Sequence, residues 1–238
     1  MLALQNGSFA GALLCALFPL CWSGTHFHTK TKENALINVK LFSVKGFVPV
    51  VMITIFSAPT ITLIAAYLIR YSQAVLGFTA AQTGAWGIRR AVPVILSPII
   101  GIWLSRSVKK SRNYKVALIL GGFVEVLSVA MLFFCLKPGT QGWMILLSLC
   151  LFQAGAAFEN SPGKALMAST IPQEMRGSGL AIQAYAMSCV STIYTAIAGV
   201  LYNSMGFTSS IVWMIAIALV CLCIRQVIAF TKLNDLQV

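Results

Sequence analysis

The amino-acid sequence predicts an all-α membrane protein with about seven transmembrane helices. Of its 238 residues, 58% are hydrophobic and 9% charged, and the mean hydropathy is +0.86. Soluble domains carry about 25% charged residues, so most of this chain is unsuited to water. The apolar residues fall into runs of about 20, the length that crosses the hydrocarbon core of a bilayer. Basic residues gather mainly between these runs, as in multispanning proteins.

We expect the chain to be organised as one bundle with short extensions. We expect one transmembrane helix in residues 1–23, a cytoplasmic connector with an interfacial segment in 24–46, six further transmembrane helices in 47–230 and a cytoplasmic tail in 231–238. The third span begins at a capping-box pattern, because Thr79 is followed three residues later by Gln82. In chain order the expected spans are Leu2 to Trp22, about Phe47 to Ile69, Gln82 to Leu104, Val116 to Leu136, Trp143 to Met167, Gly177 to Leu201 and Ile211 to Ala229.

The connectors predict an orientation. Connectors after even-numbered spans hold only Arg70 and Lys137. Eleven basic residues follow odd-numbered spans or lie in the tail: Lys30, Lys32, Lys40, Lys45, Arg106, Lys109, Lys110, Arg112, Lys115, Arg176 and Lys232. By the positive-inside rule this predicts a multi-pass protein of the plasma or inner membrane with a cytoplasmic C-terminus. Met1 would then lie outside without a signal peptide, which suggests the back part of a longer protein.

Several function classes are excluded by the same pattern. The net charge of +12 does not indicate nucleic-acid binding, because the basic residues lie in membrane connectors. The seven cysteines lie in apolar runs without metal-type spacing. We find no phosphate-binding glycine loop, nucleophile elbow or metal-binding helix pair, and therefore expect no enzyme, no cofactor and no metal.

The stretch from Trp143 to Arg176 carries polar residues inside an apolar run, so we expect it to line a polar path. Gln153, Asn160 and Lys164 recur at i, i+7 and i+11 and point the same way within about 40°. Glu159 is offset from them, and Pro162–Gly163 is expected to break the helix. Gln153 and Asn160 suit substrate binding or bonding between helices, whereas Lys164 suits an interface anchor better.

Glu125 is the candidate proton-titrating or substrate-contacting carboxylate of the fourth span. It lies roughly 13 Å from the expected cytoplasmic end, which is close to the bilayer midplane. Glycines and a serine share its face, so we expect that face to pack against protein: Gly121, Gly122 and Ser128. The alternative is a structural ion pair with Arg89 or Arg90, whose expected depth differs from that of Glu125 by roughly 8 Å.

Arg89 and Arg90 in turn admit two interpretations. One arginine can hold an anionic substrate or stabilise ionised Glu125, or it can extend to the outer surface.

The sixth span carries small residues at helical spacing, more typical of a packing seam than of a binding site. They are Ala184, Ser188, Ser191, Thr195 and Gly199. Gln183, Tyr185 and Tyr194 of the same span are candidates for reaching a cavity.

Four ordered segments resemble the C-terminal six-helix bundle of the major facilitator superfamily, specifically its fourteen-span drug:proton antiporter branch. They are Ala35-Leu36-Ile37-Asn38-Val39-Lys40-Leu41-Phe42, then Leu76-Gly77-Phe78-Thr79-Ala80-Ala81-Gln82-Thr83-Gly84, then Ser97-Pro98-Ile99-Ile100-Gly101 leading to Leu104-Ser105-Arg106, and Ile171 to Leu180. The resemblance implies that residues 1–23 are a linker transmembrane helix and that 47–230 form the C-terminal six-helix transporter bundle. It also implies a gating loop that includes Gly101, Ser105 and Arg106. Ser105 stands where the family usually has an acidic residue.

The resemblance also implies a function. It suggests proton-coupled efflux of small molecules by a multidrug-type antiporter, of which this chain would be the C-terminal half. Protons, lipophilic or cationic drugs, the bilayer and a missing N-terminal half would then be its partners. The alternative is a truncated, non-transporting membrane protein or scaffold that lacks its N-terminal bundle.

Overall fold

The computed structural model describes residues 39–44, 46–88, 95, 99, 110–137 and 139–232, without the side chains of 39, 40, 110–114 and 159–162. The described residues form helices joined by short turns, and none of them forms a strand. The expected first span, most of the third and the tail beyond 232 lie outside the described residues. The elements are the 3-10 helix η1 (Val39–Ser43), α2 (Phe47–Thr62), the π-helix η2 (Leu63–Leu68), α3 (Ile69–Ala74), α5 (Lys110–Cys135), α6 (Gly142–Thr170), the 3-10 helix η3 (Gln173–Met175) and α7 (Arg176–Lys232).

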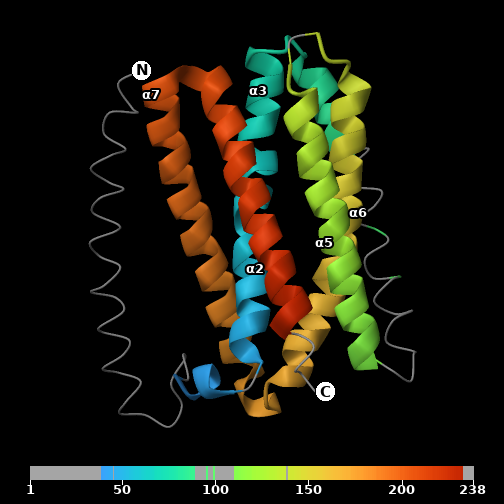
Figure 1. Cartoon of the computed structure of the whole chain (residues 1–238), viewed down its shortest axis with the longest axis vertical. Helices are drawn as coiled ribbons and strands as arrows, with labels where there is room; N and C mark the ends of the chain where they lie inside the picture. The colour runs from blue at the N-terminus through green and yellow to red at the C-terminus, as the bar shows by residue number, and fades with distance from the viewer. Residues whose placement is uncertain are drawn as a thin grey trace.

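Long helices run side by side and reverse direction at short turns (Figure 1). α2, η2 and α3 follow one another without a break, and α5 and α6 are antiparallel neighbours. α7 folds back on itself at Gly206, where the backbone leaves helical geometry with φ 77° and ψ 172°. Its first arm (176–205) and second arm (207–232) are antiparallel. The reversal is possible at Gly206 because glycine adopts a positive φ without a steric penalty.

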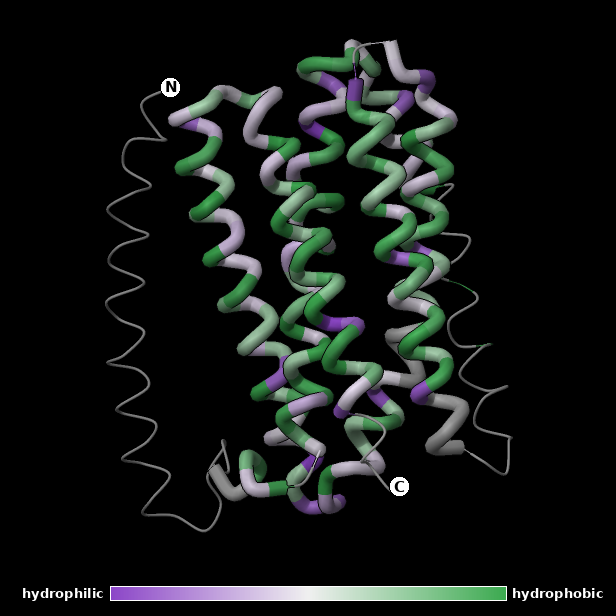
Figure 2. The backbone as a smooth tube through the Cα atoms, viewed as in Figure 1, coloured by the Kyte–Doolittle hydropathy of each residue, from purple (hydrophilic) through white to green (hydrophobic). Residues whose placement is uncertain are grey.

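Four helical segments are long and apolar enough to cross a membrane: Phe47–Ala74, Lys115–Cys135, Gly142–Thr170 and Gln173–Lys232. Large apolar side chains also point outward, and Leu127, Val200 and Val227 are between 60 and 68% exposed. Apolar residues follow the length of the helices, whereas hydrophilic ones lie mostly near the ends (Figure 2). This distribution suits lipid around the helices better than water.

Two expectations about helix ends can be compared with the structure. The capping box is confirmed, because Thr79 N donates to Gln82 Oε1 at 2.9 Å and Gln82 N donates to Thr79 Oγ1 at 3.2 Å. The break expected at Pro162–Gly163 is wrong, since α6 continues to Thr170. A proline removes a single backbone donor, and a helix inside a bundle continues through that loss.

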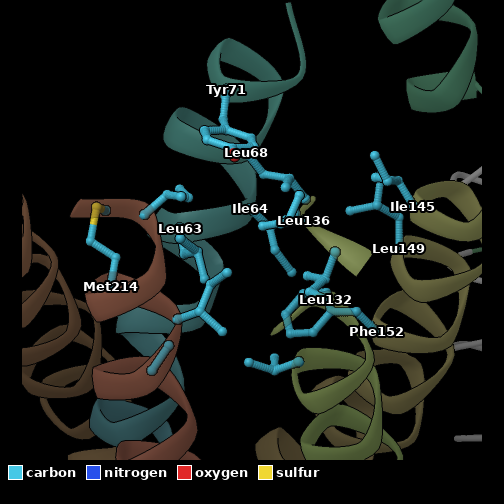
Figure 3. Close-up of a cluster of buried hydrophobic side chains, with 14 of the residues drawn as sticks. Leu63, Ile64, Leu68, Tyr71, Leu132, Leu136, Ile145, Leu149, Phe152 and Met214 are labelled. Carbon is cyan, nitrogen blue, oxygen red and sulfur yellow. The ribbon is translucent and has the colours of Figure 1, made fainter. Parts of the chain in front are cut away.

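An apolar core fills the half of the bundle that contains η2 (Figure 3). Leu63, Leu132 and Ile145 bring α5, α6 and the α2–η2 helix together, and Met214 adds the second arm of α7. In the same half, Ser128 Oγ donates to Ser148 O at 2.7 Å and Ser148 Oγ donates to Ser128 O at 2.6 Å. These reciprocal bonds join α5 to α6 where apolar packing alone has little directional preference.

The other half of the bundle, which contains the start of α2 and the end of α6, holds buried charged side chains. A second apolar cluster around Leu41, Phe47 and Leu166 closes the end at which α2 and α5 begin and α6 ends. Between the two clusters lie the only buried ionised side chains of the described part of the chain.

Candidate functional site

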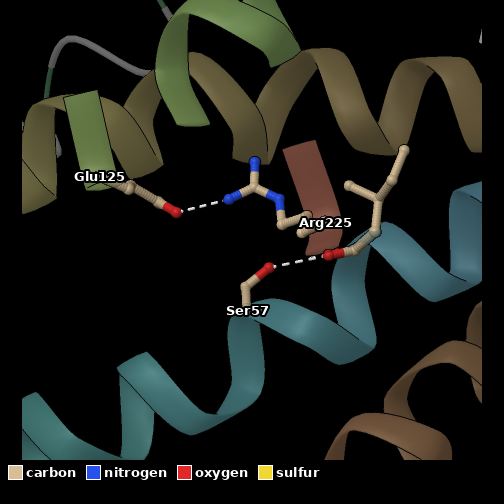
Figure 4. Close-up of polar contacts among 4 residues, drawn as sticks. Ser57, Glu125 and Arg225 are labelled. Carbon is tan, nitrogen blue, oxygen red and sulfur yellow. Dashed lines mark hydrogen bonds and ion pairs between the residues drawn. The ribbon is translucent and has the colours of Figure 1, made fainter. Parts of the chain in front are cut away.

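The centre of the candidate site is an ion pair between α5 and the second arm of α7. Arg225 Nη1 donates to Glu125 Oε2 at 2.6 Å, and the two side chains are 0% and 2% exposed. Figure 4 shows both side chains extending toward each other across the helix interface. Two charges so far from solvent are tolerated only because each compensates the other.

Glycines make the approach to this pair possible. A Cβ built on Gly155 of α6 would lie 2.6 Å from Gly121 O and 2.7 Å from Glu125 Cγ, closer than packed atoms allow. A Cβ on Gly122 would overlap the Gln226 amide and come within 3.0 Å of Arg225 Nη2. Bare backbone at these positions therefore brings α6 and α7 against α5. Packing of the Glu125 face against protein, predicted from the sequence, is confirmed, because Gly121, Gly122 and Ser128 are all buried.

α2 supplies the remaining side of the pair. Ser57 is buried and lies on the α2 face turned toward Arg225 (Figure 4). Its hydroxyl donates to Ile53 O at 3.0 Å, a bond within its own helix. Ser57 therefore lines the site, but its hydroxyl hydrogen is bonded to its own helix and not to the ion pair.

A cavity of about 340 Å³ opens beside the pair. It is enclosed by α2, α5, α6 and the first arm of α7, and Glu125 forms part of its wall. Gln183 Nε2 donates to Thr54 Oγ1 at 2.6 Å across this wall, which joins α7 to α2. The lining consists of Val50, Ile53, Thr54, Ser57, Ile61, Leu118, Glu125, Ala156, Gly163, Lys164, Leu180, Gln183, Ala184 and Met187.

The structure brings together three residues that the sequence analysis had considered for a polar path. Glu125, Lys164 and Gln183 all line the cavity. Gln153 is half-buried on α6 but does not line it. The backbones of Glu159 and Asn160 lie in α6, and their side chains fall outside the described part. Arg89, Arg90, Gly101, Ser105 and Arg106 also lie outside the described residues.

Arg225 was missed by the sequence analysis. The ion-pair alternative gave Glu125 a partner in the third span, whereas the structure supplies one from the last helix. A signal was present, because Arg225 is the only charged residue between Ile211 and Ala229. An isolated ionisable residue in an apolar run marks a buried polar contact. Depth along a helix, however, does not show which of several helices faces a carboxylate.

The packing seam expected on the first arm of α7 stays a prediction, because the described helices do not cover it. Four of its members are exposed, Ala184, Ser188, Thr195 and Gly199, and no described atom lies within 4 Å of a Cβ built on Gly199. Spacing selects a helix face but not the surface it meets. Tyr194 is buried instead, and its hydroxyl donates to Met214 O at 2.8 Å, so it joins the two arms of α7.

The chemistry available at this site is charge compensation and hydrogen bonding. Among the described residues, no group of three or more His, Cys, Asp or Glu side chains is placed to hold a metal ion. Comparison with known proteins finds no protein-family model and no curated protein that matches this sequence.

Proposed function

We propose that this chain forms a bundle of a membrane transporter and moves small molecules in exchange for protons. The observation that carries the proposal is the Glu125–Arg225 pair, which is buried in an apolar helical bundle beside a cavity whose mostly apolar wall includes Glu125. Ionisable groups at such depth are costly and commonly serve ion or substrate pathways. The proposed fold is the C-terminal bundle of the major facilitator superfamily, supported by the ordered motifs and by the four long apolar helices.

The ion pair supplies a physical basis for coupling. A proton that binds Glu125 removes its negative charge and thereby breaks the ion pair with the buried Arg225. Removing one partner of a buried pair costs about 3–5 kcal/mol. That cost favours any arrangement in which α5 and the second arm of α7 separate or the cavity admits water or an anion. Proton binding and helix rearrangement are thereby linked.

The proposal is tested by transport in proteoliposomes under an imposed pH gradient. The probes are two permanently charged solutes with the same apolar body, 3-phenylpropane-1-sulfonate and trimethyl(3-phenylpropyl)ammonium, together with ethidium. We expect the wild-type chain to move at least one probe against its gradient. We also expect Glu125→Gln to abolish the dependence on the pH gradient while downhill movement persists.

The double variant Glu125→Gln/Arg225→Gln separates coupling from folding, because it leaves no unpaired buried charge. A double variant that folds and still transports in proportion to the pH gradient would remove Glu125 from the mechanism. The same assay is repeated with a major facilitator N-terminal bundle co-reconstituted, since transporters of this type bind substrate between two bundles.

The second candidate is a non-transporting membrane protein in which the pair has a structural role. Full burial and mutual neutralisation of Glu125 and Arg225 favour it. In that case no probe moves under either condition, and the substitutions change only thermal stability.

A further inference from the structure

The cavity has two chemically different ends. The Cβ of a residue at position 163 would lie 3.6 Å from Leu118 Cδ2, so the neighbouring Lys164 lies near the level of Leu118 on α5. Glu125 is seven residues further along α5, which corresponds to roughly 10 Å of helix. The cavity therefore reaches from a lysine near the end of α6 to the buried ion pair.

The charges on its wall do not cancel. Among the described residues of the lining only Glu125 and Lys164 are charged, and Glu125 is already neutralised by Arg225 at 2.6 Å. Lys164 forms no salt bridge with an acidic side chain of the described residues. Counting Lys164, Arg225 and Glu125 together, the described charged side chains give this site a formal charge of +1. A cation entering it would meet this positive charge, whereas an anion would compensate it.

The rest of the lining is mostly apolar. Its apolar members include Ile53 and Ile61 of α2 and Leu180 and Met187 of α7. A volume of about 340 Å³ is within the range of small-ligand pockets, roughly 300–1,000 Å³. These dimensions suit a compact molecule with one charged group and one apolar body.

We propose that this cavity binds an organic monoanion with an apolar body, held at its anionic group by Lys164. The inference rests on the proposed function and specifies the substrate class of the same site. This class differs from the cationic drugs that the family resemblance suggests. The anionic group is a sulfonate, carboxylate or phosphate, and the apolar body lies against Ile53, Ile61 and Met187. Gln183, fixed to Thr54, borders the polar side of the site.

Binding is measured by isothermal titration calorimetry on the full chain in phosphatidylcholine nanodiscs. The probes are again 3-phenylpropane-1-sulfonate and trimethyl(3-phenylpropyl)ammonium, which share a phenylpropyl body. We expect the sulfonate to bind at least about tenfold more tightly than the ammonium compound, because only the sulfonate can pair with Lys164. Desolvation offsets much of that gain, so we do not expect a much larger difference. Equal binding of both, tighter binding of the cation or no sulfonate binding would overturn the proposal.

Lys164→Gln identifies the residue responsible. We expect it to weaken sulfonate binding about tenfold, and Lys164→Arg to retain most of the affinity because the charge remains. Lys137→Gln is the matched control, since Lys137 lies in the connector between α5 and α6 at the opposite end of the bundle. Ala184→Leu tests the location, because the larger side chain fills part of the cavity without changing a charge, and it should abolish sulfonate binding. Equal affinities of wild type and Lys164→Gln would contradict the assignment.

One further measurement distinguishes a lipid headgroup from a free solute as the source of the anion. A comparison of binding with transport distinguishes failure of the anion class from failure of the proposed function. Adding phosphatidylglycerol to the nanodiscs weakens sulfonate binding if a lipid headgroup occupies the cavity, and leaves it unchanged if the ligand is a free solute. Sulfonate binding that depends on Lys164, without any transport, refutes the proposed function alone. Proton-driven transport of the ammonium compound with no sulfonate binding refutes the anion class alone.

Discussion

The two halves of this bundle are built on different principles. The half that contains η2 is filled by apolar side chains such as Leu63, Leu132 and Ile145, and its buried serines bond reciprocally between α5 and α6. The other half holds a cavity and the Glu125–Arg225 pair. When one apolar side chain of a core is shortened, the loss of stability grows with the volume that is removed. A buried charge pair depends on both members, so this half can respond to a single proton.

The largest effect is expected at the ion pair. Arg225→Met leaves Glu125 buried without its partner and should cost about 3–5 kcal/mol of unfolding free energy. Glu125→Gln combined with Arg225→Met should recover most of that loss, because no buried charge remains. Thermal unfolding in detergent, followed by tryptophan fluorescence, measures both. A double variant no more stable than Arg225→Met would show that the two residues are not energetically coupled.

The apolar half should lose stability without losing coupling. Leu132→Ala removes a fully buried side chain of α5 and should cost about 2–5 kcal/mol. At temperatures where the Leu132→Ala protein is folded, its transport should depend on the pH gradient as strongly as that of the wild type. Loss of coupling in a folded Leu132→Ala protein would contradict the division between the halves. Leu127→Ala, on the exposed face of α5, is the control.

Disturbing the close contact between α6 and Glu125 should lower the unfolding free energy by an intermediate amount. Gly155→Ala would place a methyl group 2.6 Å from Gly121 O, and the resulting displacement should cost about 1–3 kcal/mol. Gly84→Ala is the matched control, because no described atom lies within 4 Å of its added Cβ. The two variants are compared by thermal unfolding. Equal midpoints would show that α6 can shift away from α5 without penalty.

The smallest effect is expected where a hydrogen bond is lost without a charge. Ser128→Ala removes the donor to Ser148 O and should cost about 1 kcal/mol. Ser188→Ala, whose hydroxyl donates only to Ala184 O within the exposed face of its own helix, should change the midpoint less. A loss at Ser128 as large as that at Arg225 would remove the contrast between the two halves.

Local sequence features predicted much of the fold. The apolar runs indicated the helices α2, α5 and α6, and the Thr79–Gln82 pattern indicated the start of the next helix. The two separate spans expected at Gly177 to Leu201 and Ile211 to Ala229 indicated the reversal within α7. Each of these depends on neighbours within a few residues of one another, so the sequence is sufficient.

The candidate site was predicted only in part. Glu125 was identified because an acidic residue in an apolar run is conspicuous, and its buried face followed from Gly121 and Gly122. Its partner was not identified, since Arg225 lies a hundred residues further along the chain.

The sequence by itself determined which segments are helical, which of them suit a bilayer and that a carboxylate at position 125 needs compensation. Only the tertiary structure decided that Arg225 provides it and that a cavity whose described lining includes Glu125 and Lys164 lies beside the pair. Hydropathy and helical periodicity are properties of one segment, whereas an ion pair and a cavity depend on the relative rotation of several helices. Those rotations are fixed by close contacts such as Gly155 against Gly121 O, which the order of residues alone does not specify.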